Sequence, residues 1–246
     1  MSNLEIPAVL SDKKELGRLQ ILEVAVEVIA ERGFHAMSMR ELSKAVGRSL
    51  AGFYNYFSCK EELLLAIQTR ALNTLLASAK EAVSGIEDPA ASLYAFIYSH
   101  VCYVANHHAA MQVLVQEASA LDEQRRGKVR QVKEDYFQLA RTQVENVVNN
   151  GCWARPGRPD VDEVELERLT YSLFGMLNWT YGWYRPEQHG SPRELAQSIK
   201  SMAVCGMASS ASSCAHSKAC EEVDDHFAGL KLLPIFSLDK RRNKTS

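Results

Sequence analysis

Apolar residues recur at intervals of three and four along most of the chain, the spacing of amphipathic helices. In the first such stretch Leu22, Ala25 and Ile29 share one face, and Gly33 follows as a stop signal. No segment alternates in the manner of a strand, and no internal repeat is visible. The pattern predicts an all-α protein with helices over about 13–32, 39–46, 50–56, 59–83, 89–106, 109–120, 123–150, 162–184 and 192–208.

Capping boxes support several of these helix starts. In a capping box the side chain of the residue before the helix accepts a hydrogen bond from the backbone amide of the third helical residue. A Glu at that third position accepts in return from the backbone amide of the capping residue. Three pairs have the Ser form and two begin with Asp: Ser38 with Glu41, Ser58 with Glu61, Ser191 with Glu194, Asp12 with Glu15, and Asp162 with Glu165.

The chain divides by composition into three parts. We expect a small helical head over residues 15–75 and a larger helical domain over 76–208. Residues 209–217 are Ser-rich, and we expect the segment 209–246 to be a flexible tail.

The two short helices around Gly47 have the layout of a helix-turn-helix, in which the second helix enters the DNA major groove. Gly47 supplies the tight turn, and Ser43 is small enough for the helix crossing. The apolar residues that would lock the three-helix cluster are Leu42, Val46, Phe53 and Phe57.

The remaining positions of the second short helix are candidates for DNA contact. They are Ser49, Leu50, Ala51, Gly52, Tyr54, Asn55 and Tyr56. Tyrosine hydroxyls and helix N-terminal amides suit phosphate oxygens, and Lys60 can neutralise a phosphate. Asn55 is a candidate base reader, because an asparagine amide can bind adenine through two hydrogen bonds.

Residues 15–75 resemble the DNA-binding head of the tetracycline-repressor (TetR) family. The motifs that carry the likeness are Gly33-Phe34, Ser38-Met39-Arg40-Glu41-Leu42, Gly47, Phe53-Tyr54-x-Tyr56-Phe57 and Lys60-Glu61-Glu62-Leu63. The resemblance implies a homodimer that binds a palindromic double-stranded operator, and it adds Ser38 and Arg40 to the candidate contacts. Arg48 departs from the family, which usually has a small aliphatic residue there, and it would alter the packing of the turn or contact a further phosphate.

The second domain is rich in aromatic residues, most densely over 171–186. The TetR resemblance implies that residues 162–208 pair with a second subunit, and an aromatic stripe of this kind serves as core or interface more often than as a pocket. The stretch 174–192 is also similar to a TetR branch that senses acyl-CoA thioesters. That similarity implies an acyl-CoA effector held by some of Tyr98, Phe174, Asn178, Trp179 and Trp183.

A basic run on the helix at 123–150 has two interpretations. Arg125, Arg126, Lys128, Arg130 and Lys133 could meet the phosphates of CoA, or they could form an ordinary solvated helix face.

Composition narrows the function classes. The hydrophobic content of 46% allows a sizeable core, and the net charge of −2 neither supports nor excludes DNA binding. Residues 1–58 hold seven Lys/Arg and seven Asp/Glu, so the motif, and not the charge, indicates DNA. The six cysteines form no CxxC pair, which favours a reduced, cytoplasmic protein. Residues 89–116 lack Asp, Glu, Lys and Arg, but their polar residues favour a buried helix pair over a membrane span.

No catalytic motif, cofactor motif or metal-ligand spacing is present, and His100, His107 and His108 lack nearby acidic partners. The sequence therefore predicts a transcriptional repressor, not an enzyme, released from DNA by an acyl-CoA. The alternatives are a multidrug-efflux repressor that senses hydrophobic or cationic compounds and, more distantly, a helical-bundle adaptor or enzyme.

Overall fold

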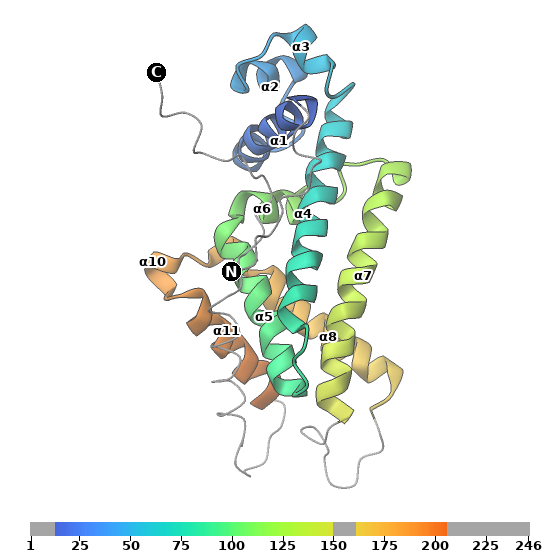
Figure 1. Cartoon of the computed structure of the whole chain (residues 1–246), viewed down its shortest axis with the longest axis vertical. Coiled ribbons are helices and arrows are strands. Elements are labelled where there is room, and N and C mark those ends of the chain that lie inside the picture. The colour runs from blue at the N-terminus through green and yellow to red at the C-terminus, as the bar shows by residue number, and fades with distance from the viewer. Residues whose placement is uncertain (1–12, 150–160, 206–246) are drawn as a thin grey trace.

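The computed structural model describes residues 13–149 and 161–205, and within those ranges the chain forms helices and no strands (Figure 1). The helices are α1 (Lys13–Arg32), α2 (Met39–Ala45), α3 (Leu50–Tyr54), α4 (Lys60–Val83), α5 (Pro89–Asn106), α6 (His108–Gln116), α7 (Glu123–Val147), α8 (Glu163–Asn178), α9 (Thr180–Trp183), α10 (Pro186–His189) and α11 (Pro192–Lys200). A short π-helix, η3 (Ser201–Cys205), continues α11. The all-α prediction is confirmed, and most predicted helix bounds agree within a few residues.

Three expectations fall outside the described residues. They are the Asp12 cap, the end of the last predicted helix beyond 205, and the tail over 209–246.

The molecule is elongated, with a head made of α1, α2 and α3 at one end (Figure 1). The long helix α4 runs from this head into the larger domain, where it packs against α5 and α7. Its 24 residues span about 36 Å at 1.5 Å per residue. One continuous hydrophobic cluster extends from Leu19 in the head to Leu195 in α11, so the two parts share a core.

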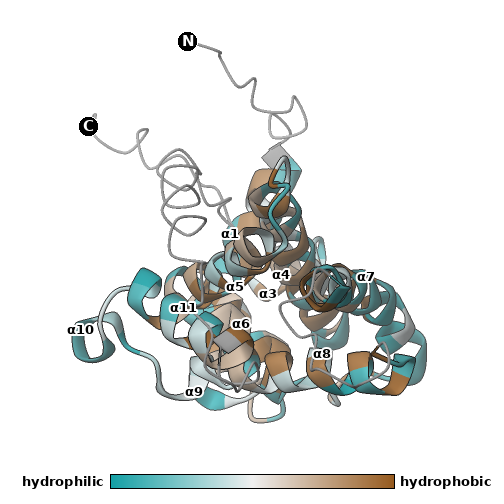
Figure 2. Ribbon diagram, turned by 90° about the horizontal axis from the view of Figure 1, so that it is seen from below, coloured by the Kyte–Doolittle hydropathy of each residue, from teal (hydrophilic) through white to brown (hydrophobic). Residues whose placement is uncertain are grey.

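Helix α5 lies at the centre of the larger domain and contacts α4, α7 and α11. It begins at a cap made by Asp88, whose carboxylate accepts from the Ala91 amide at 2.7 Å, and Pro89 occupies the first turn. The absence of charged side chains between 89 and 116 lets this helix be buried on all sides. Seen from below, the apolar residues gather toward the interior of the bundle (Figure 2). No helix among the described residues has a stretch both long enough and apolar enough to cross a membrane.

The expected capping box of Ser58 with Glu61 is wrong. Helix α4 begins one residue later, with Cys59 as its cap, so Glu62 occupies the third position. The Glu62 carboxylate accepts from both the amide and the hydroxyl of Ser58, at 2.8 and 2.7 Å. These hydrogen bonds, led by that from the Ser58 amide, lower the pKa of Glu62.

The single helix expected over 162–184 is also wrong, because α8 ends at Asn178 and α9 begins at Thr180. The Thr180 hydroxyl donates to the Leu177 carbonyl at 2.6 Å and is fully buried. A threonine that bonds to a nearby carbonyl in this way competes with the helix ladder and bends it. The Asp162 and Ser191 caps at the starts of α8 and α11 are confirmed.

Candidate functional site

The helix-turn-helix of the head is held by local hydrogen bonds. Ser38 and Glu41 form a full capping box at α2: the Ser38 amide donates to the Glu41 carboxylate at 2.8 Å, and the Glu41 amide donates to the Ser38 hydroxyl at 3.3 Å. These bonds from Ser38 lower the pKa of Glu41. Gly47 has a φ of 70°, a conformation that favours glycine, and the next amide, of Arg48, donates to the Ser43 carbonyl at 2.9 Å. The sequence placed this turn correctly.

The packing of the three head helices also agrees with the prediction. Leu42, Phe53 and Phe57 are buried, and Val46 packs against them in part. Ser43 is buried where α2 crosses its neighbours, and its hydroxyl donates to the Arg40 carbonyl at 2.9 Å. The aromatic and aliphatic residues of this cluster therefore fix α3 against α1 and α2.

The predicted DNA contacts gather on the outside of this cluster, from the start of α2 to the start of α4. Ser38, Arg40, Ser49, Ala51, Tyr54 and Asn55 are exposed, and Arg48, Leu50, Gly52, Tyr56 and Lys60 are half-buried. Ser49 caps α3 by accepting from the Gly52 amide at 3.1 Å. Tyr54 is 49% exposed, which leaves its hydroxyl accessible to a phosphate.

Lys60 and Arg48 each make contacts that the sequence did not predict. The Lys60 ammonium lies 4.6 Å from the centre of the Phe34 ring and 3.5 Å from the Phe34 carbonyl oxygen. The Arg48 guanidinium lies over the Tyr56 ring at 4.9 Å. Both cations are thus held against aromatic rings on the surface of the head.

Hydrogen bonds between segments far apart in sequence join the head to α6. The backbone amide of Phe34 donates to the Glu117 carboxylate at 2.9 Å, and the side-chain amide of Gln112 donates to the Ala30 carbonyl at 2.8 Å. The Gln68 side chain, buried in α4, donates to the Glu117 carbonyl at 3.0 Å. The end of α1 is therefore tied to α6, and α6 is tied to α4, by polar side chains that belong to no sequence motif.

A cavity of about 450 Å³ lies between α4, α6, α7 and α8. Its walls are mainly apolar, with charged side chains from α7 at one side. The lining residues are Leu72, Leu75, Met111, Leu114, Val115, Ala118, Arg130, Lys133, Glu134, Tyr136, Phe137, Tyr171, Phe174 and Asn178. Phe174 and Asn178, two of the five predicted ligand contacts, are among them.

The basic run of α7 resolves into two kinds of side chain. Arg125 and Arg126 pair with Asp122 and Glu123, and Arg130 pairs with Glu123 at 2.7 Å. Lys133 has no ion-pair partner within the described ranges and lines the cavity, where burial lowers its pKa. Most of the run is therefore a solvated, paired helix face, and Arg130 and Lys133 alone among its five residues reach the cavity.

A buried hydrogen-bonded pair, His100 and Tyr136, lies next to the cavity, and the sequence did not predict this contact. His100 of α5 is completely buried, and its Nδ1 lies 2.9 Å from the hydroxyl of Tyr136, a cavity residue. Burial lowers the pKa of His100 to about 4, against a smaller opposing effect of the Leu177 carbonyl, so the imidazole is neutral at pH 7. Burial also raises the pKa of Tyr136. No group of three or more His, Cys, Asp and Glu suited to a metal ion occurs in the described part of the chain.

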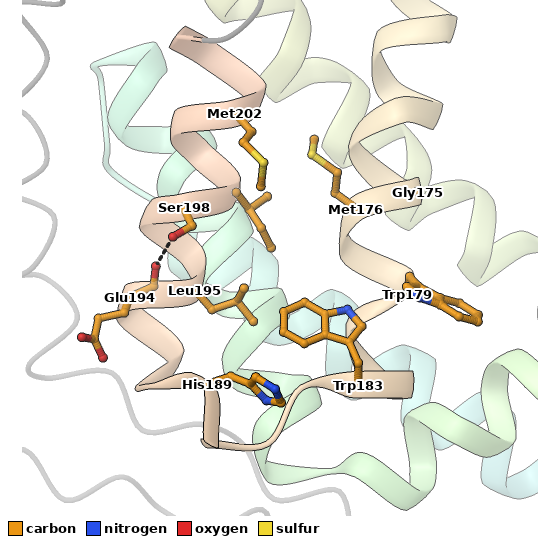
Figure 3. Close-up of a pocket in the computed structure, with 10 residues that line it drawn as sticks. Gly175, Met176, Trp179, Trp183, His189, Glu194, Leu195, Ser198 and Met202 are labelled. Atoms are coloured by element: carbon orange, nitrogen blue, oxygen red, sulfur yellow. Dashed lines mark hydrogen bonds between the residues drawn. The ribbon is translucent and has the colours of Figure 1, made fainter. Parts of the chain in front are cut away.

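The other three predicted ligand contacts lie elsewhere. Trp179 and Trp183 line a separate groove of about 530 Å³ between α8, α9 and α11. Figure 3 shows the Trp183 indole pointing into this groove toward Leu195, whereas Trp179 points away from it. Tyr98 of α5 stacks on Tyr94 and lines neither hollow. The five residues therefore do not surround one ligand site.

The groove opens on a face that carries large exposed apolar side chains. Trp179 is 65% exposed and Met202 is 56% exposed, and Val164 of α8 is comparably exposed. Single apolar residues on a surface are ordinary, but a cluster on two neighbouring helices marks an interaction surface. This face, made by α8 and α11, is the region for which the sequence predicted a dimer contact.

Two family models match the chain. Residues 21–67 match "Bacterial regulatory proteins, tetR family", and residues 87–207 match "Tetracyclin repressor-like, C-terminal domain". Among curated proteins, the chain is 26% identical over 191 residues to the HTH-type transcriptional repressor KstR2 of Mycobacterium tuberculosis, covering 77% of this chain and 92% of the relative. It is 23% identical over 190 residues to the Fatty acid metabolism regulator protein of Bacillus subtilis, covering 77% and 94%.

Solved structures agree on the fold. The TetR family regulator PfmR of Thermus thermophilus aligns with a TM-score of 0.66 and 26% identity, over 75% of this chain and 97% of that one. AibR, solved with isovaleryl coenzyme A and operator DNA, aligns with a TM-score of 0.67 and 22% identity, over 76% and 98%. Both matching models and the head geometry lead to one conclusion: the chain belongs to the TetR family of bacterial transcription regulators.

Proposed function

We propose that this regulator is a homodimeric repressor that binds a palindromic operator and is released by an acyl-CoA thioester. The cavity between α4, α6, α7 and α8 is the observation that carries the ligand part of the proposal. Its apolar walls suit an acyl chain, and its volume falls within the range of small-molecule sites. Arg130 and Lys133 at its side favour an anionic group.

The charge of the cavity separates the proposed ligand from a cationic one. Three charged side chains line the cavity, the cations Arg130 and Lys133 and the carboxylate Glu134, so the lining carries one net positive charge, which disfavours a cationic drug. A CoA thioester has an apolar acyl chain that suits the apolar walls, and its phosphates carry the charge opposite to that of Arg130 and Lys133. At about 450 Å³ the cavity has room for an acyl group and part of the pantetheine arm, which leaves the nucleotide outside.

Similarity adds support to this assignment. KstR2 is named as a transcriptional repressor, and the relative from Bacillus subtilis is named as a fatty acid metabolism regulator. AibR has the same fold and was solved with isovaleryl coenzyme A. A ligand of the same chemical class is therefore proposed for this chain.

The second copy of the chain is proposed to cover the α8 and α11 face. Trp179, Met202 and Val164 present an apolar surface there that a protomer leaves in water. A two-fold axis at this face would place two heads side by side, as an operator with half-sites about 34–36 Å apart requires.

Helix α6 supplies a route from the ligand to the head. Met111 and Leu114 face the cavity, whereas Gln112 and Glu117 hold the end of α1. A ligand that displaces α6 would loosen those hydrogen bonds and shift the dimer toward a spacing that no longer fits successive major grooves.

The test is a titration of the protein–DNA complex. Labelled duplex from beside the regulator's own gene is bound at fixed salt, and release is followed by fluorescence anisotropy. A series of acyl-CoA thioesters should release the DNA, whereas the matching free acids and CoA alone should not. Release by cationic dyes with inert acyl-CoAs would instead identify the multidrug-efflux sensor, and absence of DNA binding would favour an adaptor.

A further inference from the structure

The side chain of Arg48 lies along α1 and is held there by neutral groups. Its Nη2 donates to Gln20 Oε1 at 3.3 Å, and its Nη1 makes a long contact of 3.5 Å with the Tyr56 hydroxyl. The guanidinium carbon is 4.9 Å from the centre of the Tyr56 ring. Neither hydrogen-bond partner carries a charge, so the positive charge of Arg48 is not compensated by these contacts.

Four arginines of the larger domain differ from Arg48 in this respect. Arg125, Arg126, Arg130 and Arg141 each pair with a carboxylate. Within the part of the chain that the structure describes, Arg48 has no such partner. An arginine has five N–H donors, and the two hydrogen bonds leave three of them for another acceptor. The fork of a guanidinium matches a phosphate.

Helix α1 has a glycine, Gly17, at the point where the Arg48 and Tyr56 side chains come closest to it. Gly17 is buried in α1, and a Cβ added there would lie 2.5 Å from the Tyr56 hydroxyl oxygen, 2.9 Å from Tyr56 Cζ and 3.0 Å from Arg48 Nη2. Glycine inside a helix destabilises the helix relative to alanine, so its presence here requires a reason. The close approach of Tyr56 and Arg48 supplies that reason.

We propose that Arg48 and Tyr56 form one phosphate-binding pair on the operator backbone, and that Gly17 and Gln20 of α1 are the positioning residues that set it. Gly17 gives the tyrosine hydroxyl room against α1, and Gln20 holds the guanidinium over the ring. The donors of Arg48 and the Tyr56 hydroxyl then meet the same phosphate from fixed positions. Helix α1 therefore takes part in DNA recognition through two residues that touch the pair and not the DNA.

The pair adjoins the start of the recognition helix. Arg48 directly precedes Ser49, the cap of α3, and Tyr56 follows its end. Contacts with phosphates fix the register of a protein on the duplex, so this pair would set how α3 enters the groove. The proposal depends on DNA binding by this head and not on the identity of the ligand.

Gly17→Ala is the first test, with Gly127→Ala as its matched control. Both glycines are inside helices, but a Cβ at Gly127 meets nothing within 4 Å. Gly17→Ala should leave the head folded, because the half-buried Tyr56 ring and Arg48 guanidinium can turn away from α1, and should weaken operator binding by at least about tenfold. Gly127→Ala should bind as the original protein does. Equal affinity for Gly17→Ala and the original protein would overturn the proposal.

The salt dependence of binding separates a phosphate contact from a purely structural role. Arg48→Val removes the charge while restoring the aliphatic side chain usual in the family, so the head should remain folded. The slope of log K against log salt should become shallower by about 1.8, because a dimer loses two phosphate contacts. Gln20→Met keeps the length of the side chain but not the acceptor. It should lower affinity by about tenfold, because a dimer loses two neutral hydrogen bonds of about threefold each.

Arg48→Val keeps the proposal testable if Gly17→Ala fails to fold. A folded Arg48→Val protein with an unchanged slope would overturn the phosphate role. A Gln20→Met effect that persists in the Arg48→Val background would overturn its positioning role, since the two residues should then act independently. The same slope can be measured on non-specific duplex at low salt, so a protein that binds no duplex at all contradicts the proposed function and the pair together, whereas duplex binding with an unchanged slope in Arg48→Val contradicts the pair alone.

Discussion

Replacing Glu117 by alanine tests whether α6 carries the ligand signal to the DNA-binding head. The Glu117 carboxylate accepts the Phe34 amide at 2.9 Å in a partly buried position, 83 residues away in sequence. A hydrogen bond to a charged group contributes about 1.5–3 kcal/mol. If the bond exists in the DNA-binding state and is broken when the cavity is filled, its loss penalises only the first state.

The expected result follows from that asymmetry. Without ligand, Glu117→Ala should shift the free protein toward the released conformation and weaken operator binding by up to about 10- to 150-fold for each protomer, because 1.4 kcal/mol corresponds to a factor of ten. With saturating ligand, the affinity should match that of the original protein. The factor by which ligand weakens DNA binding should therefore shrink by the same amount, which is a loss of coupling free energy.

Anisotropy titrations with and without ligand measure both affinities directly. Glu117→Gln keeps an acceptor for the Phe34 amide but loses the charge, so it should fall between the alanine variant and the original protein. Glu81→Ala, an exposed residue near the far end of α4, is the control. Equal weakening by Glu117→Ala in both states would refute the coupling role and leave a purely structural one.

Three further predictions concern the dimer face, the cavity and the buried imidazole. Met202→Glu should place a charge in η3, on the exposed face formed with α8 and α11, and give folded monomers in analytical ultracentrifugation. A dimer at micromolar concentration would contradict the proposed dimer face. Lys133→Glu should weaken release by acyl-CoA at least about tenfold while Lys128→Glu, outside the cavity, should not; equal effects would argue against a cation at the ligand. His100 has its pKa lowered to about 4 from 6.5, so below pH 6.5 the unfolded chain binds a proton that the folded chain does not. In urea unfolding, the free energy of unfolding should therefore be highest above pH 6.5 and should fall by at most about 3 kcal/mol between pH 6.5 and 4. An unfolding midpoint that does not change over this pH range would contradict the neutral, buried imidazole.

The sequence alone predicted the features that depend on residues close together in the chain. The capping boxes at Ser38 and Ser191, the turn at Gly47 and the bounds of α5 all follow from interactions within a few positions. Helix periodicity and caps are local rules, so one sequence is enough to apply them. The motif of the head likewise lies within one continuous stretch.

Even local rules failed where two neighbouring solutions compete. Ser58 was expected to pair with Glu61, but the start of α4 moved by one residue and Glu62 took the role. The helix at 162–184 was expected to be continuous, but Thr180 bonds back to Leu177 and divides it. In both cases a side chain offers the backbone an alternative of similar energy, and the packing of the whole molecule selects between them.

Only the tertiary structure decided which side chains share a site. Phe174 and Asn178 line the cavity, whereas Trp179 and Trp183, a few positions on, line the groove beside α11, because neighbouring positions of a helix face different sides. The contacts of Glu117 with Phe34, of His100 with Tyr136 and of Arg48 with Gln20 join positions 28 to 83 residues apart. Periodicity fixes the face on which a side chain lies, but the partner it meets there depends on how distant helices pack.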